Sequence, residues 1–187
     1  MELPWSSPGF VNVYFIEDKD GYVMIDCGVN GIEYQELLES KMKSFGLSYQ
    51  NVKLLIGTHM HSDHIGLSST LREKDIPFAL YKNSVDFIDS YNDWSIRFKK
   101  LKEFAKREGA PESFLNDLDE MVTPIYAGKI SKPDVLLDEG NIKNVNRNIE
   151  IIFTPGHDKT EISILDNPSQ ILFSGDHILP KITPFIP

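Results

Sequence analysis

Short apolar runs and one helical pattern alternate along the first third of the chain. Two runs rich in β-branched and aromatic residues flank a polar turn that ends in Asp20-Gly21, which is typical of a β-hairpin. A later segment has apolar residues at close to helical spacing and is followed by Gly46, a suitable helix terminator. We therefore expect strands over 10–16 and 22–25, a helix over 32–45, and a strand over 52–56 that is apolar enough to be buried on both faces.

The middle of the chain is helical in pattern, and the last third returns to short apolar runs. Residues 62–74 predict a helix, 78–81 a strand, and the charged segment 83–122 an insert of at least two helices divided at Gly109. Strand-rich halves around a helical insert indicate an α/β fold. A length of 187 residues without a repeat indicates one domain over 1–187. The last third predicts strands over 135–137, 149–153, 162–165 and 170–173.

Composition narrows the classes of protein to which the chain can belong. With 41% hydrophobic and 25% charged residues, it is typical of a globular domain. A formal net charge of −9 disfavours a nucleic acid as partner, because phosphate contacts need clustered Lys and Arg. The single Cys27 cannot form an intrachain disulfide, the N-terminus does not resemble a signal peptide, and no apolar run is long enough to span a membrane. We therefore expect a cytoplasmic protein without a membrane partner.

The histidines gather in three short segments. Of the five in the chain, three lie within the six residues from His59 to His64, and the other two are His157 and His177. Imidazole is a common ligand for zinc and related metals, so this concentration predicts a metal site. In an extended segment, His59 and His61 point to the same side and can bind one ion together.

Further candidate ligands come from the ends of predicted elements. If a helix begins near Ser62, Asp63 and His64 lie on its first turn and can face a second ion. His157 follows a strand and a Pro-Gly turn, and Asp176 follows the last predicted strand. A carboxylate has two oxygens, so Asp176 can bridge two ions.

Each of these residues also has an interpretation without a metal. A lone histidine is more often an ordinary core or surface residue, and only the cluster makes ligation the better interpretation of His157. Asp176 has the alternative of being a turn-forming aspartate, although we favour ligation. We expect His177 to point away from Asp176, and Asp26 to support the metal loop by accepting a hydrogen bond from it. Cys27 is most simply a small buried apolar residue.

The segment from Thr58 to Gly66 resembles the HxHxDH signature of the metallo-β-lactamase superfamily. Residues 23–28, 154–157 and 173–176 resemble further motifs of that family, in the same order. The resemblance implies an αββα sandwich with a dinuclear metal site. By that resemblance the first ion is held by His59, His61 and His157, the second by Asp63 and His64, and Asp176 bridges the two.

One departure from the family pattern concerns the second ion. The family supplies a further histidine after the bridging aspartate, whereas here no histidine follows His177. We therefore expect a C-terminally truncated member with an incomplete second half-sandwich. The alternatives are a second site that is incomplete by nature or one that a partner chain completes. The second metal position of a truncated chain would be empty or weakly held, and a homodimer through the second half becomes possible.

Two bound dications and two aspartates leave a local charge of about +2, which favours hydroxide formation from water. We therefore expect a zinc-dependent hydrolase in which a metal-bound hydroxide cleaves a small thioester, lactone or related ester, as in glyoxalase II. Iron or manganese can replace zinc. Asp63 is the expected catalytic residue, which orients the nucleophile or transfers a proton. The helical insert is expected to cover the site, with Trp94, Arg97 and Phe98 as candidate lining residues.

Three other functions stay open. A phosphodiesterase or ribonuclease of the same fold, like ribonuclease Z, is disfavoured by the negative charge. A di-iron electron-transfer protein of the flavodiiron type would have Glu in place of His61 and would lack a ligating histidine at position 64. The last alternative is a metal-binding protein that is inactive in this truncated form.

Overall fold

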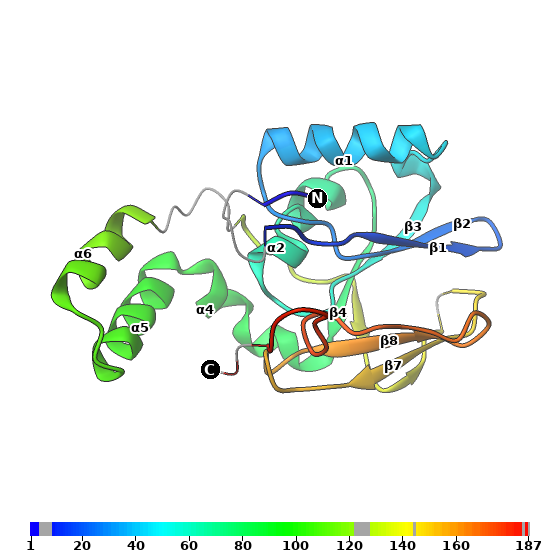
Figure 1. Ribbon diagram of the computed structural model, residues 1–187. Helices are drawn as coiled ribbons and strands as arrows, with labels where there is room; N and C mark the ends of the chain where they lie inside the picture. The colour runs from blue at the N-terminus through cyan, green and yellow to red at the C-terminus, as the bar shows by residue number, and fades with distance from the viewer. Residues whose placement is uncertain (4–8, 122–127, 144, 185, 187) are drawn as a thin grey trace.

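The computed structural model describes residues 1–3, 9–121, 128–143, 145–184 and 186, with the backbone alone described at 94, 97 and 117–121. It contains two β-sheets that face each other (Figure 1). The first sheet has the strand order β1-β2-β3-β4-β5. Its strands are β1 (Tyr14–Asp18), β2 (Gly21–Ile25), β3 (Val52–Ile56), β4 (Phe78–Tyr81) and β5 (Val135–Leu137). β1 and β2 form the predicted antiparallel hairpin, and the other neighbouring strands pair in parallel.

The second sheet is antiparallel throughout. Its strands, in order, are β6 (Gly140–Asn141), β7 (Ile149–Phe153), β8 (Ile162–Asp166) and β9 (Ile171–Phe173). One face buries Ile151 and Ile164 against Ile25 and Ile56 of the first sheet, so one hydrophobic core lies between the sheets. On the opposite face, the apolar residues Ile152, Leu165 and Leu172 are half-buried or exposed.

Helices cover the other face of the first sheet. They are α1 (Ile32–Ser44), α2 (Ser62–Ile65) and α3 (Ser68–Arg72), together with the 3₁₀ turn η1 (Tyr49–Asn51). Met42 and Ile65 from these helices pack on Met24, Leu55 and Phe78 of the sheet, and this forms a second core. The first sheet is therefore buried on both faces, as its apolar strands predict.

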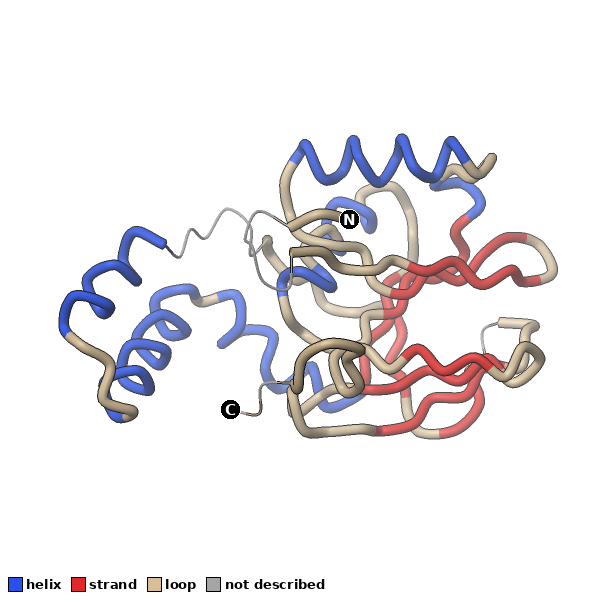
Figure 2. The backbone as a smooth tube through the Cα atoms, in the orientation of Figure 1, coloured by secondary structure: helices blue, strands red, loops and turns tan. Residues whose placement is uncertain are grey.

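The predicted insert is helical and extends away from the two sheets (Figures 1 and 2). It contains the 3₁₀ segment η2 (Lys82–Phe87), α4 (Ile88–Asn92), α5 (Trp94–Arg107) and α6 (Glu112–Met121). Asp93 caps α5 by accepting a hydrogen bond from the Ile96 amide at 3.2 Å. In the described part of the chain, no helix has the length and apolar character that crossing a bilayer requires.

The α/β fold class is confirmed, and the predicted strands 52–56 and 78–81 match β3 and β4. The predicted strand 10–16 is wrong in its first half, since β1 begins at Tyr14. The amide of Val11 instead donates to the Met1 carbonyl at 2.8 Å. That part of the chain pairs with the N-terminal segment rather than with β2. The two-residue strand β6 was not predicted.

The prediction of one continuous helix over 62–74 is wrong, because the structure has two short helices there. The carbonyl of His64 accepts hydrogen bonds from the amides of Cys27 and Gly28, at 2.6 and 3.2 Å. It therefore does not continue the hydrogen-bonding pattern of the helix. Gly66 follows at a point of close approach, where a Cβ would lie 2.4 Å from the Asn30 nitrogen. Hydrogen bonds to the segment after β2 therefore end α2 early.

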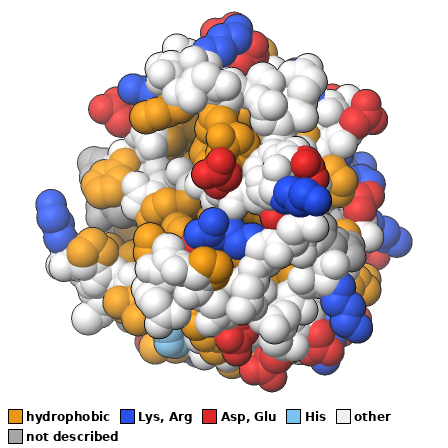
Figure 3. Space-filling view, turned by 90° about the vertical axis from the view of Figure 1, so that its right-hand side faces the viewer, with side chains coloured by type: hydrophobic (Ala, Val, Ile, Leu, Met, Phe, Trp, Pro, Cys, Tyr) orange, Lys and Arg blue, Asp and Glu red, His pale blue; other side chains and the backbone are white. Residues whose placement is uncertain are grey.

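Asp18 ties the two sheets together at the end of the sandwich that carries the β1–β2 turn. Its buried carboxylate accepts hydrogen bonds from the amides of Asn146 and Arg147, at 3.1 and 2.8 Å. The guanidinium of Arg147 in turn binds the Asp166 carboxylate of β8 at 2.6 Å. Figure 3 shows this end, where charged side chains of both signs surround hydrophobic ones. Burial opposes ionisation of Asp18, but the hydrogen bonds led by the Asn146 amide outweigh it and lower its pKa to about 2.

We expect Asp18→Asn to reduce the free energy of unfolding by about 2 kcal/mol at pH 7, from the depression of the pKa relative to an unfolded aspartate. Because the folded pKa is the lower one, this stability is present above about pH 4 and is lost as the pH falls toward 2. The two proteins should therefore converge in acid. Urea unfolding at several pH values measures the difference. Asp20→Asn, on the exposed part of the same turn, is the control and should change little. An equal loss in both variants would contradict this account.

Candidate metal centre

Three loops bring the predicted ligands to one end of the sandwich. His59 and His61 lie in the loop after β3, and His64 lies in α2 directly behind them. His157 lies in the loop after β7, and Asp176 in the turn after β9. The first sheet thus supplies three of the histidines, and the second sheet supplies the fourth and the carboxylate. The helical insert extends from this same end (Figure 1).

His59, His61 and His157 form one group. One ring nitrogen from each lies within 4.8 Å of the others. Nε2 of His157 is 2.8 Å from Nδ1 of His61, and the His59 and His61 rings are 4.6 Å apart between centroids. His59 and His157 are buried, and His61 is nearly so. The arrangement matches the first ligand set that the sequence predicts.

His59, His64 and Asp176 form a second group next to the first. One oxygen of Asp176 lies 3.3 Å from Nε2 of His64, and the other lies 3.5 Å from Nε2 of His157. The carboxylate therefore reaches both groups, as a bridging ligand must. Asp63 belongs to neither group among the described residues, but its carboxylate lies 3.8 Å from Nε2 of His64. All six predicted ligands thus lie together.

The donor atoms suit a metal ion. Nε2 of His59 is buried and has no hydrogen-bond partner in the described part of the chain, which is unfavourable unless a ligand occupies its lone pair. Nδ1 of His59 lies 3.0 Å from the hydroxyl of Thr58, whose proton is directed to Asp26 at 2.9 Å. The hydroxyl then accepts from Nδ1–H, so the lone pair is on Nε2. Burial, with the neighbouring imidazoles, lowers the pKa of His59 well below its usual value and keeps the ring neutral.

Asp26 fixes the loop that carries these histidines. Its carboxylate accepts the Thr58 amide at 2.8 Å and lies 2.7 Å from Nδ1 of His64. The predicted supporting role of Asp26 is therefore confirmed. Burial disfavours a charge on His64, but the carboxylates of Asp26 and Asp176 outweigh it and raise the pKa of His64. A cation bound between His64 and Asp176 would take the place of that proton.

Sequence reasoning did not identify Glu161, which lies next to the centre. Its side chain is fully buried, one oxygen accepts the Asp176 amide at 2.9 Å, and the other lies 4.0 Å from Nδ1 of His177. Burial is the main cause that raises the pKa of Glu161 to about 7. The only signal in the sequence is a charged residue placed directly before the apolar run of β8.

The other candidates belong to neither group or lie outside the described residues. His177 is 41% exposed in its side chain, and Cys27 is buried and unbridged. The side chains of Trp94 and Arg97 lie outside the described residues. Phe98 is half-buried with the Lys102 ammonium 5.2 Å from its ring centre, so its lining role stays a prediction.

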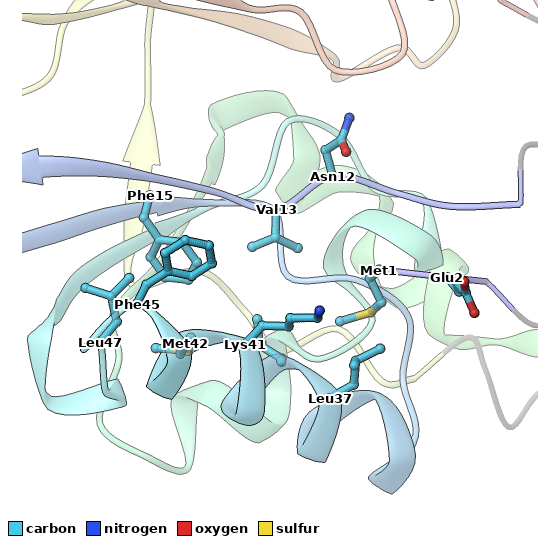
Figure 4. A pocket seen from close by; sticks show the side chains of 11 residues that line it. Met1, Glu2, Asn12, Val13, Phe15, Leu37, Lys41, Met42, Phe45 and Leu47 are labelled. Carbon is cyan, nitrogen blue, oxygen red and sulfur yellow. The ribbon is translucent and has the colours of Figure 1, made fainter.

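A groove of about 540 Å³ lies elsewhere, between α1 and the segment that leads into β1 (Figure 4). Its lining is mostly apolar, with Val13, Met42 and Phe45 among the residues, and Lys41 lies beside them. None of the predicted ligands lines it. The chemistry is therefore concentrated in the histidine groups, away from this groove.

Comparison with known proteins gives a consistent family. The family model described as "Metallo-beta-lactamase superfamily" matches residues 6–187. The probable metallo-hydrolase YflN of Bacillus subtilis is 24% identical over 90% of this chain and 61% of its own length. The hydroxyacylglutathione hydrolase GloC of Haemophilus influenzae is 26% identical over 86% of this chain and 62% of its own length. The chain thus spans about three fifths of these relatives.

A solved structure shows the same fold. The metallo-beta-lactamase family protein TTHA1429 from Thermus thermophilus superimposes with a TM-score of 0.78 and 21% identity. The match covers 99% of this chain and 60% of the other. The likeness therefore includes the insert as well as the two sheets.

We expect zinc to raise the melting temperature of the metal-free chain, because the ion binds the folded site and not the unfolded chain. At a free zinc concentration 100 times the dissociation constant, the gain is about 2.7 kcal/mol. His59→Ala should abolish most of the shift, since His59 belongs to both groups. His177→Ala is the matched control and should keep it. Scanning calorimetry with and without zinc measures the shift. An unchanged shift in His59→Ala would show that zinc binds elsewhere.

Proposed function

Because the chain belongs to the metallo-beta-lactamase superfamily, we propose that it is a metal-dependent hydrolase of small thioesters, lactones or related esters. The observation that carries the proposal is the pair of adjacent ligand groups that share His59 and are linked by the carboxylate of Asp176. Under this proposal His59, His61 and His157 hold one ion, and Asp63, His64 and Asp176 hold a second. Zinc is the proposed metal at both positions, since nitrogen and carboxylate ligands suit it.

Ions bound here would supply Lewis acidity, which polarises a scissile carbonyl and lowers the pKa of water. The protein's own residues supply position and proton transfer. Asp26 holds His64, and Thr58 sets the protonated nitrogen of His59. Asp63 is 16% exposed in its side chain, so it is open to the substrate side while close to His64. We assign Asp63 the role of orienting the attacking water or moving its proton.

The net charge of the chain and its resemblance to a relative both support an acyl compound as the substrate. A net charge of −9 disfavours long phosphodiester substrates, which need clustered cations. The relative GloC is named as a hydrolase of hydroxyacylglutathione, an acyl compound, and it matches 86% of the present chain. A thioester or an activated ester has a good leaving group, so electrophilic activation of the carbonyl contributes most of the catalysis that it needs.

A substrate panel tests the proposal. The chain is loaded separately with zinc, iron or manganese and assayed on acyl thioesters, lactones, aryl esters and a bis-aryl phosphodiester. Turnover of a thioester, lactone or ester that chelation abolishes supports the proposal. Turnover of the phosphodiester alone would favour the nuclease alternative, and bound metal without turnover would favour a binding protein. Either of these outcomes overturns the acyl hydrolase.

Substitutions should separate metal binding from catalysis. We expect Asp63→Asn to lower kcat about 100-fold or more, because it removes a proton-transfer group, with a smaller effect on metal content. His64→Ala should lower occupancy of the second ion more than that of the first. Metal analysis alongside kinetics on the best panel substrate measures both effects.

The exposed Asp89→Asn in α4 is the control and should match the parent protein in both measurements. Equal loss of both ions in His64→Ala would contradict the assignment of two separate positions.

A further inference from the structure

The turn that carries Asp176 has few attachments to the rest of the fold. It follows β9, and its own hydrogen bonds are local, from the His177 amide to the Ser174 carbonyl at 3.0 Å and from the Ser174 hydroxyl to the Ile178 carbonyl. Among the described residues, one hydrogen bond joins its backbone to another segment, from the Asp176 amide to Glu161 at 2.9 Å. The position of Asp176 therefore depends on Glu161.

Glu161 itself is held firmly. It lies directly before β8, its carbonyl accepts the Thr154 amide at 3.0 Å, and its amide donates to the Asp158 carbonyl. The next amide, of Ile162, donates to the Thr58 carbonyl at 2.9 Å, beside His59. The backbone of Glu161 is thus fixed between the loop of His157 and the loop of His59.

The packing around the carboxyl group leaves it little freedom. It is fully buried, and a Cβ at Gly175 would lie 3.1 Å from both Glu161 Oε1 and Thr58 Oγ1. Gly175 also has a φ of 54°, which favours glycine and lets the turn approach this closely. Oε2 has no hydrogen-bond partner among the described residues. A buried carboxyl group with an unpartnered oxygen is unfavourable for stability alone, so its presence beside the ligands points to a role in the site.

We propose that Glu161 is a positioning residue: by accepting the Asp176 amide, it sets the Asp176 carboxylate between His64 and His157 and so determines how tightly the second ion is bound. The proposal rests on the metal centre of the proposed function and assigns a residue to it. Groups that orient metal ligands typically contribute about 10- to 100-fold in metal affinity. Asp176 reaches both histidines with different oxygens, so a displaced turn would break both contacts.

Two variants of similar size test the hydrogen bond. Glu161→Leu removes the acceptor while keeping the volume filled, and Glu161→Gln keeps an acceptor oxygen but not the charge. Glu150→Leu, on the outward face of β7, is the control for losing a carboxylate elsewhere. Titration of the metal-free proteins with cobalt, followed by its absorption spectrum, gives the affinity of each position without any assay of turnover.

We expect Glu161→Leu to weaken the second cobalt ion about tenfold or more and the first ion much less, with Glu161→Gln close to the parent protein. Equal weakening of both ions, no weakening, or a Gln variant as weak as the Leu variant would overturn the proposal.

A measurement on the metal-free chain keeps the test independent of ion binding. The Asp176 amide should be protected from hydrogen exchange in the parent and Gln proteins and lose protection in Glu161→Leu. Unchanged protection in the Leu variant would overturn the positioning role even if no second ion binds. Because neither readout involves a substrate, failure of this proposal is distinct from failure of the hydrolase proposal.

Discussion

The carboxylate of Asp26 is the interaction on which the metal loop depends. Asp26 directly follows β2 and has a φ of 58°, a conformation that costs a non-glycine residue roughly 1 kcal/mol or more. Its two oxygens accept hydrogen bonds from the amide and the hydroxyl of Thr58, and they also contact Nδ1 of His64. One buried side chain thus fixes the end of β3, the start of α2 and, through Thr58, the ring nitrogen that His59 presents. Without it, Thr58 and Nδ1 of His64 would lose the acceptor that they share.

Buried carboxylates recur wherever separate segments of this fold meet. Asp18 joins β1 to the loop before β7, Asp26 joins β2 to the metal loop, and Glu161 joins β8 to the turn after β9. Each accepts backbone amides that would otherwise lack partners, and this offsets the desolvation of the charge. Asp18 has enough donors to lower its pKa, whereas Glu161 has one donor and a raised pKa. Asp18 therefore stabilises the fold, whereas the burial of Glu161 next to the site costs stability.

Local patterns predicted the parts of this structure that depend on local physics. The boundaries of β3 and β4 were predicted correctly, because a strand buried on both faces has a continuous apolar sequence. The candidate ligands were read from the spacing of histidines and aspartates, and the structure brings them together. The break after α2 was not predicted, since it arises from hydrogen bonds between His64 and residues 27–28 that are distant in sequence. Glu161 was missed for the same reason: its burial follows from the position of the Asp176 turn, which no pattern around residue 161 encodes.

The centre is built from both sheets, and this links metal binding to the docking of the two layers. His59, His61 and His64 follow β3, whereas His157 and Asp176 follow strands of the second sheet. The four imidazole rings converge closely: nitrogens of His61 and His157 lie 2.8 Å apart, at hydrogen-bond distance, and three of the six ring pairs lie within 4.6 Å between centroids. The apolar core between the sheets must hold them there, helped by Asp18 at the opposite end. A bound ion would accept ligand bonds from both layers, so the same geometry that prepares the site also makes the ion a structural link between the sheets.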